Sequence, residues 1–168
     1  MPYQFNANNV FEMAEQMESN GVKFYQAAAN STDNEELKQF LNHFAQMEVA
    51  HQNIFKLLRE ELSTQEKAAT VFDPNDESTL YLQALVDSRV SFKNEYQMSS
   101  IENILKAAIE SEKDTIIFYL GMKEAVPEHL GKNKIDKIIK EEMAHIRILS
   151  QKLVKFKADE KASVGSTQ

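Results

Sequence analysis

The sequence contains no cysteine, and only four glycines and three prolines occur among its 168 residues. The lack of cysteine excludes disulfides, thiolate zinc sites and cysteine-ligated iron–sulfur clusters, and it makes a reducing cytoplasm the expected location. The scarcity of glycine and proline leaves long stretches without the residues that interrupt helices. The composition therefore favours an all-α cytoplasmic protein.

Long apolar runs and excess positive charge are also missing. No stretch approaches the roughly 20 apolar residues that span a bilayer, and the first residues lack the basic and apolar segments of a signal peptide. Lysine and arginine number 19 against 26 aspartates and glutamates, which gives a net charge of −7. Nucleic acid and membrane are therefore not expected as partners.

Apolar residues recur at helical spacing in four long segments, which predicts a four-helix bundle built from two helix pairs. The first helix is expected over residues 9–30, and the capping-box pattern Thr32-x-x-Glu35 is expected to start the second. A crossover over residues 63–98 follows, with a short helix near residues 79–87. A connection of this length lets the third long helix run parallel to the second.

The second helix pair is expected to begin at another capping-box pattern, Ser99-x-x-Glu102. Pro127 and Gly131 end the third helix and make the turn into the fourth, which is expected over residues 132–157.

The last eleven positions, residues 158–168, are small and polar and are expected to form a disordered tail. Residues 1–157 then form a single domain. A chain of this length buries about two-thirds of its unfolded surface around one core.

Six glutamates and histidines repeat at the same spacing in both halves of the chain. Each half has a single glutamate followed 30 residues later by a Glu-x-x-His pair, and a shift of 94 positions superposes one set on the other. The chain is therefore an internal repeat. The six residues are Glu18, Glu48 and His51 in the first half, and Glu112, Glu142 and His145 in the second.

All six residues fall within the apolar stripes of their helices, so they are expected to converge inside the bundle. Residues three apart share a helix face, and each Glu-x-x-His pair thus presents an oxygen and a nitrogen to one point. Four ionised carboxylates in an apolar core are very costly unless they protonate, reach water or bind cations. Two divalent cations would balance them. Oxygen and imidazole ligands suit iron or manganese, and affinity alone also admits zinc or cobalt.

These residues resemble the rubrerythrin-like branch of the ferritin-like superfamily, whose di-iron carboxylate members have this ligand set. The resemblance implies two iron ions, with Glu18 and Glu112 as terminal ligands, Glu48 and Glu142 as bridges, and His51 and His145 on one metal each. It also implies oxidation of the di-ferrous site by hydrogen peroxide or, more slowly, by dioxygen. The resemblance covers about residues 9–156 through Met17-Glu18-x-x-Gly21-x-x-Phe24-Tyr25, Glu48-x-x-His51, Glu112-Lys113-Asp114-x-x-x-Phe118-Tyr119 and Glu142-x-x-His145.

The chain departs from that family in two ways. Without cysteine it has no rubredoxin domain, so electrons are expected from a separate donor such as a rubredoxin-like protein. The additional glutamate that peroxidase members have three residues from the third-helix ligand is also missing, because Thr115 and Ile109 occupy the candidate positions. Glu110 points to the other side of the helix. A six-ligand site is therefore expected.

Two tyrosines, Tyr25 and Tyr119, lie seven residues after Glu18 and Glu112 on the same helix faces. They are candidates for hydrogen bonds to ligand carboxylates or for electron transfer, and ordinary core packing is the alternative. His43 and His129 are expected at the surface.

The leading functional hypothesis is a rubrerythrin-type peroxidase or ferroxidase. The alternatives are iron storage or delivery without turnover, and a structural bundle that holds zinc. A homodimer is expected from the family resemblance alone.

Overall fold

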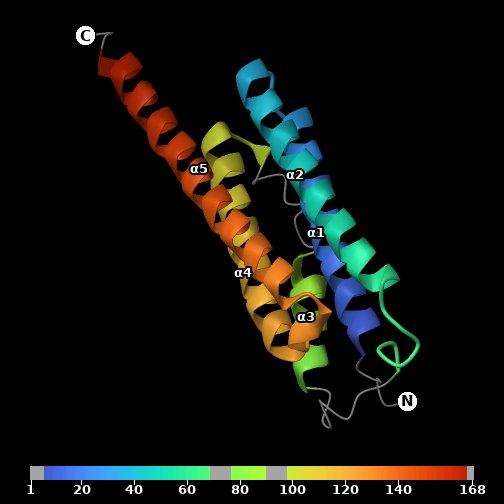
Figure 1. Cartoon of the computed structure of the whole chain (residues 1–168). Helices are drawn as coiled ribbons and strands as arrows, with labels where there is room; N and C mark the ends of the chain where they lie inside the picture. Colours follow the sequence, from blue (N-terminus) through green and yellow to red (C-terminus); the bar gives the residue numbers. More distant parts are fainter. Residues whose placement is uncertain (1–5, 69–76, 90–97, 166–168) are drawn as a thin grey trace.

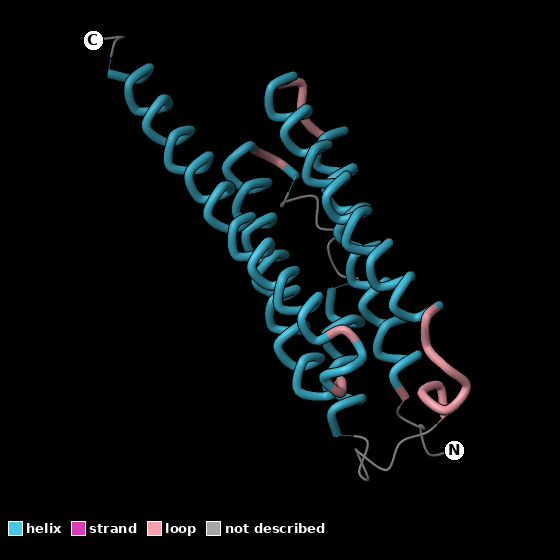
Figure 2. Tube along the Cα trace, viewed as in Figure 1, coloured by secondary structure: helices cyan, strands magenta, loops and turns pink. Residues whose placement is uncertain are grey.

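The computed structural model describes residues 6–68, 77–89 and 98–165. Within these ranges the chain is helical and has no strand (Figure 1; Figure 2). The predicted all-α four-helix architecture is confirmed. In order, the elements are α1 (Ala7–Asn30), α2 (Glu35–Glu60), α3 (Glu77–Arg89), α4 (Ile101–Ala125), the short 3-10 helix η2 (Glu128–Leu130) and α5 (Lys132–Gly165).

The four long helices form two antiparallel pairs, α1 with α2 and α4 with α5. In Figure 1, α2 and α4 both run from the upper end of the bundle to the lower end, which is the parallel arrangement expected from a long crossover. The crossover contains α3, which packs onto α1 and α4. Its residues Leu82 and Val86 are buried there in the apolar core.

The helix starts differ slightly from the predicted capping boxes. The N-cap of α2 is Asn34, whose side chain accepts a hydrogen bond from the Leu37 backbone N–H, whereas Thr32 accepts one from the Asn34 N–H just before the helix. The N-cap of α4 is Ser100, one residue after the predicted Ser99. Asparagine and serine cap equally well, so neighbouring candidates compete and tertiary packing decides between them.

The end of α5 corrects a prediction. This helix continues to Gly165, so the expected disordered tail is helical over residues 158–165; residues 166–168 lie outside the described part. Ala158, Glu160, Lys161 and Ala162 are strong helix formers and no proline interrupts them, so the helix continues although these residues are exposed. The start of α5, by contrast, lies where predicted, after Gly131 with its φ of 99°.

The apolar core consists of two clusters, one toward each end of the bundle. With the bundle oriented as in Figure 1, the cluster toward its lower end, here called the lower cluster, includes Phe11, Phe55 and Ile135. The upper cluster includes Phe44 and Leu105. Buried polar residues lie between the clusters along the helices. Among the described helices, none combines the length and apolarity needed to cross a membrane.

Candidate metal centre

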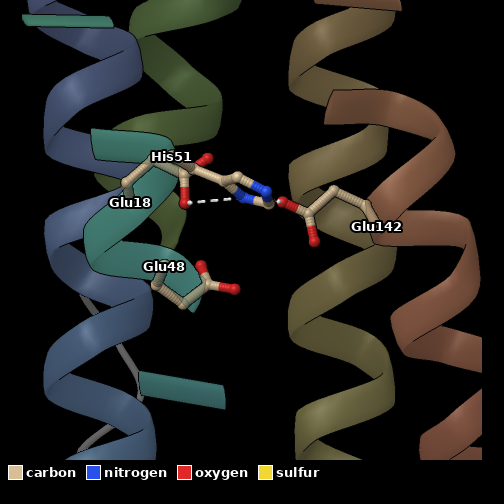
Figure 3. Close-up of side chains that lie close together, drawn as sticks. All are labelled: Glu18, Glu48, His51 and Glu142. Atoms are coloured by element: carbon tan, nitrogen blue, oxygen red, sulfur yellow. Dashed lines mark ion pairs between the residues drawn. The ribbon is translucent and has the colours of Figure 1, made fainter. Parts of the chain in front are cut away.

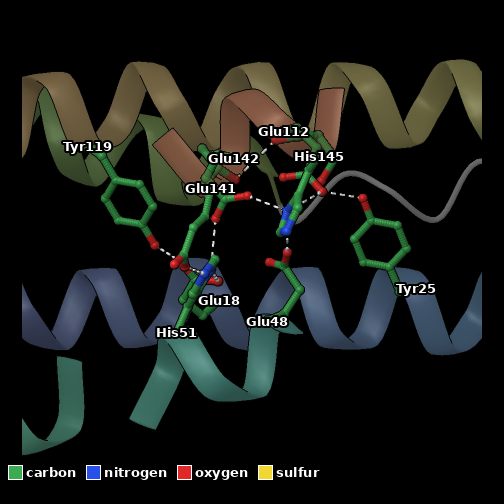
Figure 4. Close-up of polar contacts among 11 residues, drawn as sticks. Glu18, Tyr25, Glu48, His51, Glu112, Tyr119, Glu141, Glu142 and His145 are labelled. Atoms are coloured by element: carbon green, nitrogen blue, oxygen red, sulfur yellow. Dashed lines mark hydrogen bonds and ion pairs between the residues drawn. The ribbon is translucent and has the colours of Figure 1, made fainter. Parts of the chain in front are cut away.

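The six predicted site residues meet at the middle of the bundle, one or two from each long helix. Each follows the apolar stripe of its helix, so the packing that buries the stripe also buries the charge. None is more than 4% exposed. Figure 3 shows Glu18, Glu48 and His51 on one side of this centre and Glu142 facing them from α5, and Figure 4 adds the residues of the second half.

The side chains form two overlapping groups, in each of which one ligand atom per residue lies within 4.8 Å of all the others. Glu48 and Glu142 belong to both groups. The remaining members are Glu18 and His51 in the first group, and Glu112 and His145 in the second. The geometry therefore describes two adjacent groups that could each hold one cation and that share two carboxylates.

The inward-facing atoms of the site lie within ion-pair distance of one another but do not have hydrogen-bond geometry. His51 Nδ1 lies 2.9 Å from Glu142 Oε1, and His145 Nδ1 lies 2.8 Å from Glu142 Oε2. All four atoms are nevertheless buried without a hydrogen-bond partner. Buried polar atoms in proteins are normally satisfied, so this cluster lacks its partners. Oxygen and imidazole donors of this kind fit a pair of transition-metal cations.

The unsatisfied oxygens distinguish two kinds of carboxylate. Both oxygens of Glu48 and Glu142 lack a partner, whereas Glu18 and Glu112 each leave only Oε2 without one. A carboxylate shared by two cations needs two free oxygens, and a carboxylate on one cation needs one. This pattern is independent of the helical spacing from which the six residues were predicted.

The two tyrosines occupy the other oxygens of Glu18 and Glu112, and they do so across the two halves of the chain. Tyr25 on α1 donates to Glu112 Oε1 on α4, and Tyr119 on α4 donates to Glu18 Oε1 on α1 (Figure 4). Both tyrosines are fully buried. Of the three roles left open by the sequence, the structure therefore shows the hydrogen bond to a site carboxylate.

Protonation balances part of the charge in the metal-free site. Burial raises the pKa of Glu48 well above its usual range, and the neighbouring carboxylates raise it further. Burial and then Glu142 raise the pKa of Glu112 to about 8. Burial lowers the pKa of both histidines, but their carboxylate neighbours outweigh it and raise the pKa of His51 to about 11 and of His145 to about 9. At pH 7 the centre therefore holds several protons.

Metal binding is expected to release these protons, because metal ligands must be deprotonated. Glu112, His51 and His145 have pKa values above 7, and the pKa of Glu48 is also raised well above its usual range, so at least about three protons should leave per pair of metal ions at pH 7. The affinity should accordingly rise with pH. Calorimetric titration in two buffers of different ionisation enthalpy measures the number released. Equal heats in both buffers would contradict the expectation.

Two residues that contact the six central side chains, Glu141 and Gly21, were not predicted from the sequence to do so. Glu141 Oε2 lies 2.8 Å from His51 Nε2. Gly21 lies so close to Glu48 that a Cβ built on it would be 2.3 Å from Glu48 Oε2. The sequence held one signal for the first, since Glu141 stands where the other half has Met47. Nothing in the sequence showed that Gly21 makes room for a carboxylate.

The other candidates lie away from the centre. Glu110 pairs with Lys113 at the surface, and His43 and His129 are exposed as expected. Thr115 is buried and its hydroxyl donates to the Ser111 carbonyl. It supplies no carboxylate.

A four-helix bundle with paired, shared carboxylates and two histidines at its centre defines the class of dinuclear metal carboxylate proteins. Residues 9–97 match the rubrerythrin family, and the chain belongs to this family. A crystal structure of a protein from Thermotoga maritima, assigned as a ferritin-like diiron-carboxylate protein, is similar to the chain with a TM-score of 0.63 and 21% sequence identity. The match covers 91% of this chain and 97% of that one, and it shows a shared fold. A comparison with curated proteins finds no match.

Proposed function

We propose that the chain binds two iron ions through the six central residues and reduces hydrogen peroxide, with electrons from a separate donor such as a rubredoxin-like protein. The observation that carries the proposal is the set of eight buried, unsatisfied ligand atoms on these residues. Family membership supports iron as the metal. When bound, two ferrous ions supply the two electrons that convert one hydrogen peroxide and two protons into two water molecules.

The protein's own residues would hold the cations and balance their charge. Glu48 and Glu142 would bridge, because both of their oxygens are free. Glu18 with His51 would complete one position, and Glu112 with His145 the other. Four carboxylates then offset two divalent ions, which removes the cost of burying uncompensated charge of either sign.

The tyrosines would fix the orientation of the terminal carboxylates. Each hydroxyl occupies Oε1 of Glu18 or Glu112 and leaves Oε2 directed into the centre. Hydrogen-bonded partners of this kind typically contribute about 10–100-fold to metal affinity or activity. The apolar clusters on both sides restrict water at the centre, which strengthens the electrostatic interactions among these groups.

The proposal is tested by anaerobic loading with Fe(II) followed by one equivalent of hydrogen peroxide. About two iron ions per chain should bind, and peroxide should oxidise both within one turnover, faster than dioxygen does. The absorption of the oxidised site and residual Fe(II) measured with a chelator report the outcome. Glu110→Gln is a control because this carboxylate lies at the surface, away from the centre, where it forms an ion pair with Lys113.

A protein that binds iron but reacts with neither oxidant would contradict the peroxidase proposal. One observation favours that alternative, iron binding without efficient turnover. Thr115 offers no carboxylate at the position where peroxidase members have an additional glutamate. Two zinc or manganese ions in place of iron would instead indicate a structural site or different redox chemistry.

A further inference from the structure

The two halves of the metal centre differ in what holds their histidines. His51 presents Nδ1 to the centre, and its other ring nitrogen, Nε2, lies 2.8 Å from Glu141 Oε2 on α5 (Figure 4). A carboxylate can only accept, so Nε2 donates its hydrogen. When a metal ion takes the place of the proton on Nδ1, the ring is neutral and its lone pair is on Nδ1, the atom that lies 2.9 Å from Glu142 and 3.8 Å from Glu18.

In the described part of the chain, no carboxylate holds His145 in this way. His145 also presents Nδ1 to the centre, 2.8 Å from Glu142 and 3.7 Å from Glu112. Among the described residues, however, no side chain hydrogen-bonds its Nε2. The 94-residue repeat places Met47 where Glu141 stands in the other half. Met47 is half-buried against the upper apolar cluster, and a thioether is a weak acceptor without charge.

We infer that Glu141 positions His51 and makes the two metal positions unequal, so that the position beside Glu18 and His51 binds a divalent cation more tightly than the one beside Glu112 and His145. This inference rests on the proposed dinuclear site. A carboxylate on the outer nitrogen fixes the tautomer and ring orientation and increases the basicity of the ligating nitrogen, which typically changes metal affinity about 10–100-fold.

The location of Glu141 supports this assignment. Its side chain is 40% exposed, and Oε1 lies 3.7 Å from Lys137 Nζ while Oε2 contacts His51. The carboxylate therefore connects a nearly buried ring to a surface cation. A half-exposed side chain on the surface of α5 can be replaced without opening a core cavity, so variants at this position should fold.

The test is a titration of metal-free protein with Co(II) in competition with a chromophoric chelator. The wild type should bind two Co(II) ions with stepwise affinities that differ by about 10–100-fold. Glu141→Gln keeps the size of the side chain but removes its charge, and it should weaken the tighter step by that factor. Met47→Glu should strengthen the weaker step. Glu110→Gln, the matched surface carboxylate near Glu112, should change neither.

A spectroscopic readout separates positioning from a general structural effect. In the Co(II)-loaded wild type, proton NMR should show one slowly exchanging, hyperfine-shifted imidazole N–H, from His51. Glu141→Gln should make it exchange rapidly, and Met47→Glu should add a second slow signal. Equal wild-type affinities, or Glu141→Gln changing both steps alike with the N–H signal retained, would overturn the inference while two ions still bind. A wild type that binds no Co(II) would overturn the proposed site as well.

Discussion

Loading the protein with two divalent metal ions is expected to raise its melting temperature by about 16–32 °C. Each ion at 1,000 times its dissociation constant stabilises the folded state by about 4 kcal/mol, or about 8 kcal/mol for two, and a chain of 168 residues gains about 2–4 °C per kcal/mol. The physical reason is the central charge, since the metal-free fold must bury four carboxylates that only protons and two histidines offset. Differential scanning calorimetry with and without metal measures the shift.

Glu48→Leu should abolish the stabilisation by metal ions without destabilising the metal-free fold. The leucine removes a bridging ligand, so metal should no longer raise the melting temperature. In the metal-free state, replacing a buried ionisable group by an apolar one of similar size should leave the variant as stable as the wild type or about 1–4 kcal/mol more stable. Glu60→Leu, an exposed glutamate on the same helix, is the control and should keep the full metal effect. A metal-free Glu48→Leu protein much less stable than wild type would mean that the carboxylate supports the fold itself.

Gly21→Ala should sharply weaken metal binding while leaving the fold intact. The new Cβ would lie 2.3 Å from Glu48 Oε2 and 3.0 Å from Glu48 Cδ, a separation that atoms do not tolerate, so the carboxylate must move. A displaced bridge affects both metal positions, and the loss should exceed the roughly 10–100-fold typical of an outer hydrogen-bond partner. Metal content per chain and chelator competition measure it.

The control for this substitution is Gly121→Ala, another change in the middle of a long helix. Its Cβ would meet the Tyr81 ring at 3.0 Å and Leu82 Cδ2 at 3.2 Å; the Tyr81 ring is 49% exposed and can shift, and the Leu82 methyl group must move by a few tenths of an ångström. Both variants remove the roughly 1 kcal/mol that a mid-helix glycine costs. Metal affinity equal to the wild type in Gly21→Ala would show that Glu48 does not act from its observed position.

The sequence predicted the fold and the membership of the central cluster because both depend on periodicity. A carboxylate within an apolar stripe must point inward wherever the stripe packs, and the repeat brought Glu18 and Glu112 into the same layer as the two Glu-x-x-His pairs. The assignment of these residues as metal ligands remains a prediction. What the structure adds is the separation of carboxylates with one free oxygen from those with two.

Contacts between helices were not predictable in the same way. The spacing placed Tyr25 on the face of Glu18, but its hydroxyl crosses to Glu112, because the partner depends on how the two helix pairs pack. Glu141 was missed because it lies outside the apolar stripe and becomes relevant only through the approach of α5 to His51. The prediction of a disordered C-terminal tail was wrong for a simpler reason. Residues 158–165 are polar, but their helix propensity is high enough for α5 to continue through them.

Each of the two candidate ligand groups contains three residues from one half of the chain and one shared carboxylate from the other half. Tyr25 and Tyr119 cross between the halves in the same reciprocal manner. In a dimer of two identical helix pairs, symmetry would make the two positions of such a centre equal. In this chain the two halves are covalently joined and differ in sequence, so corresponding positions hold different residues. Gly21 and Glu141, which lie next to Glu48 and His51, have Thr115 and Met47 as their counterparts in the other half.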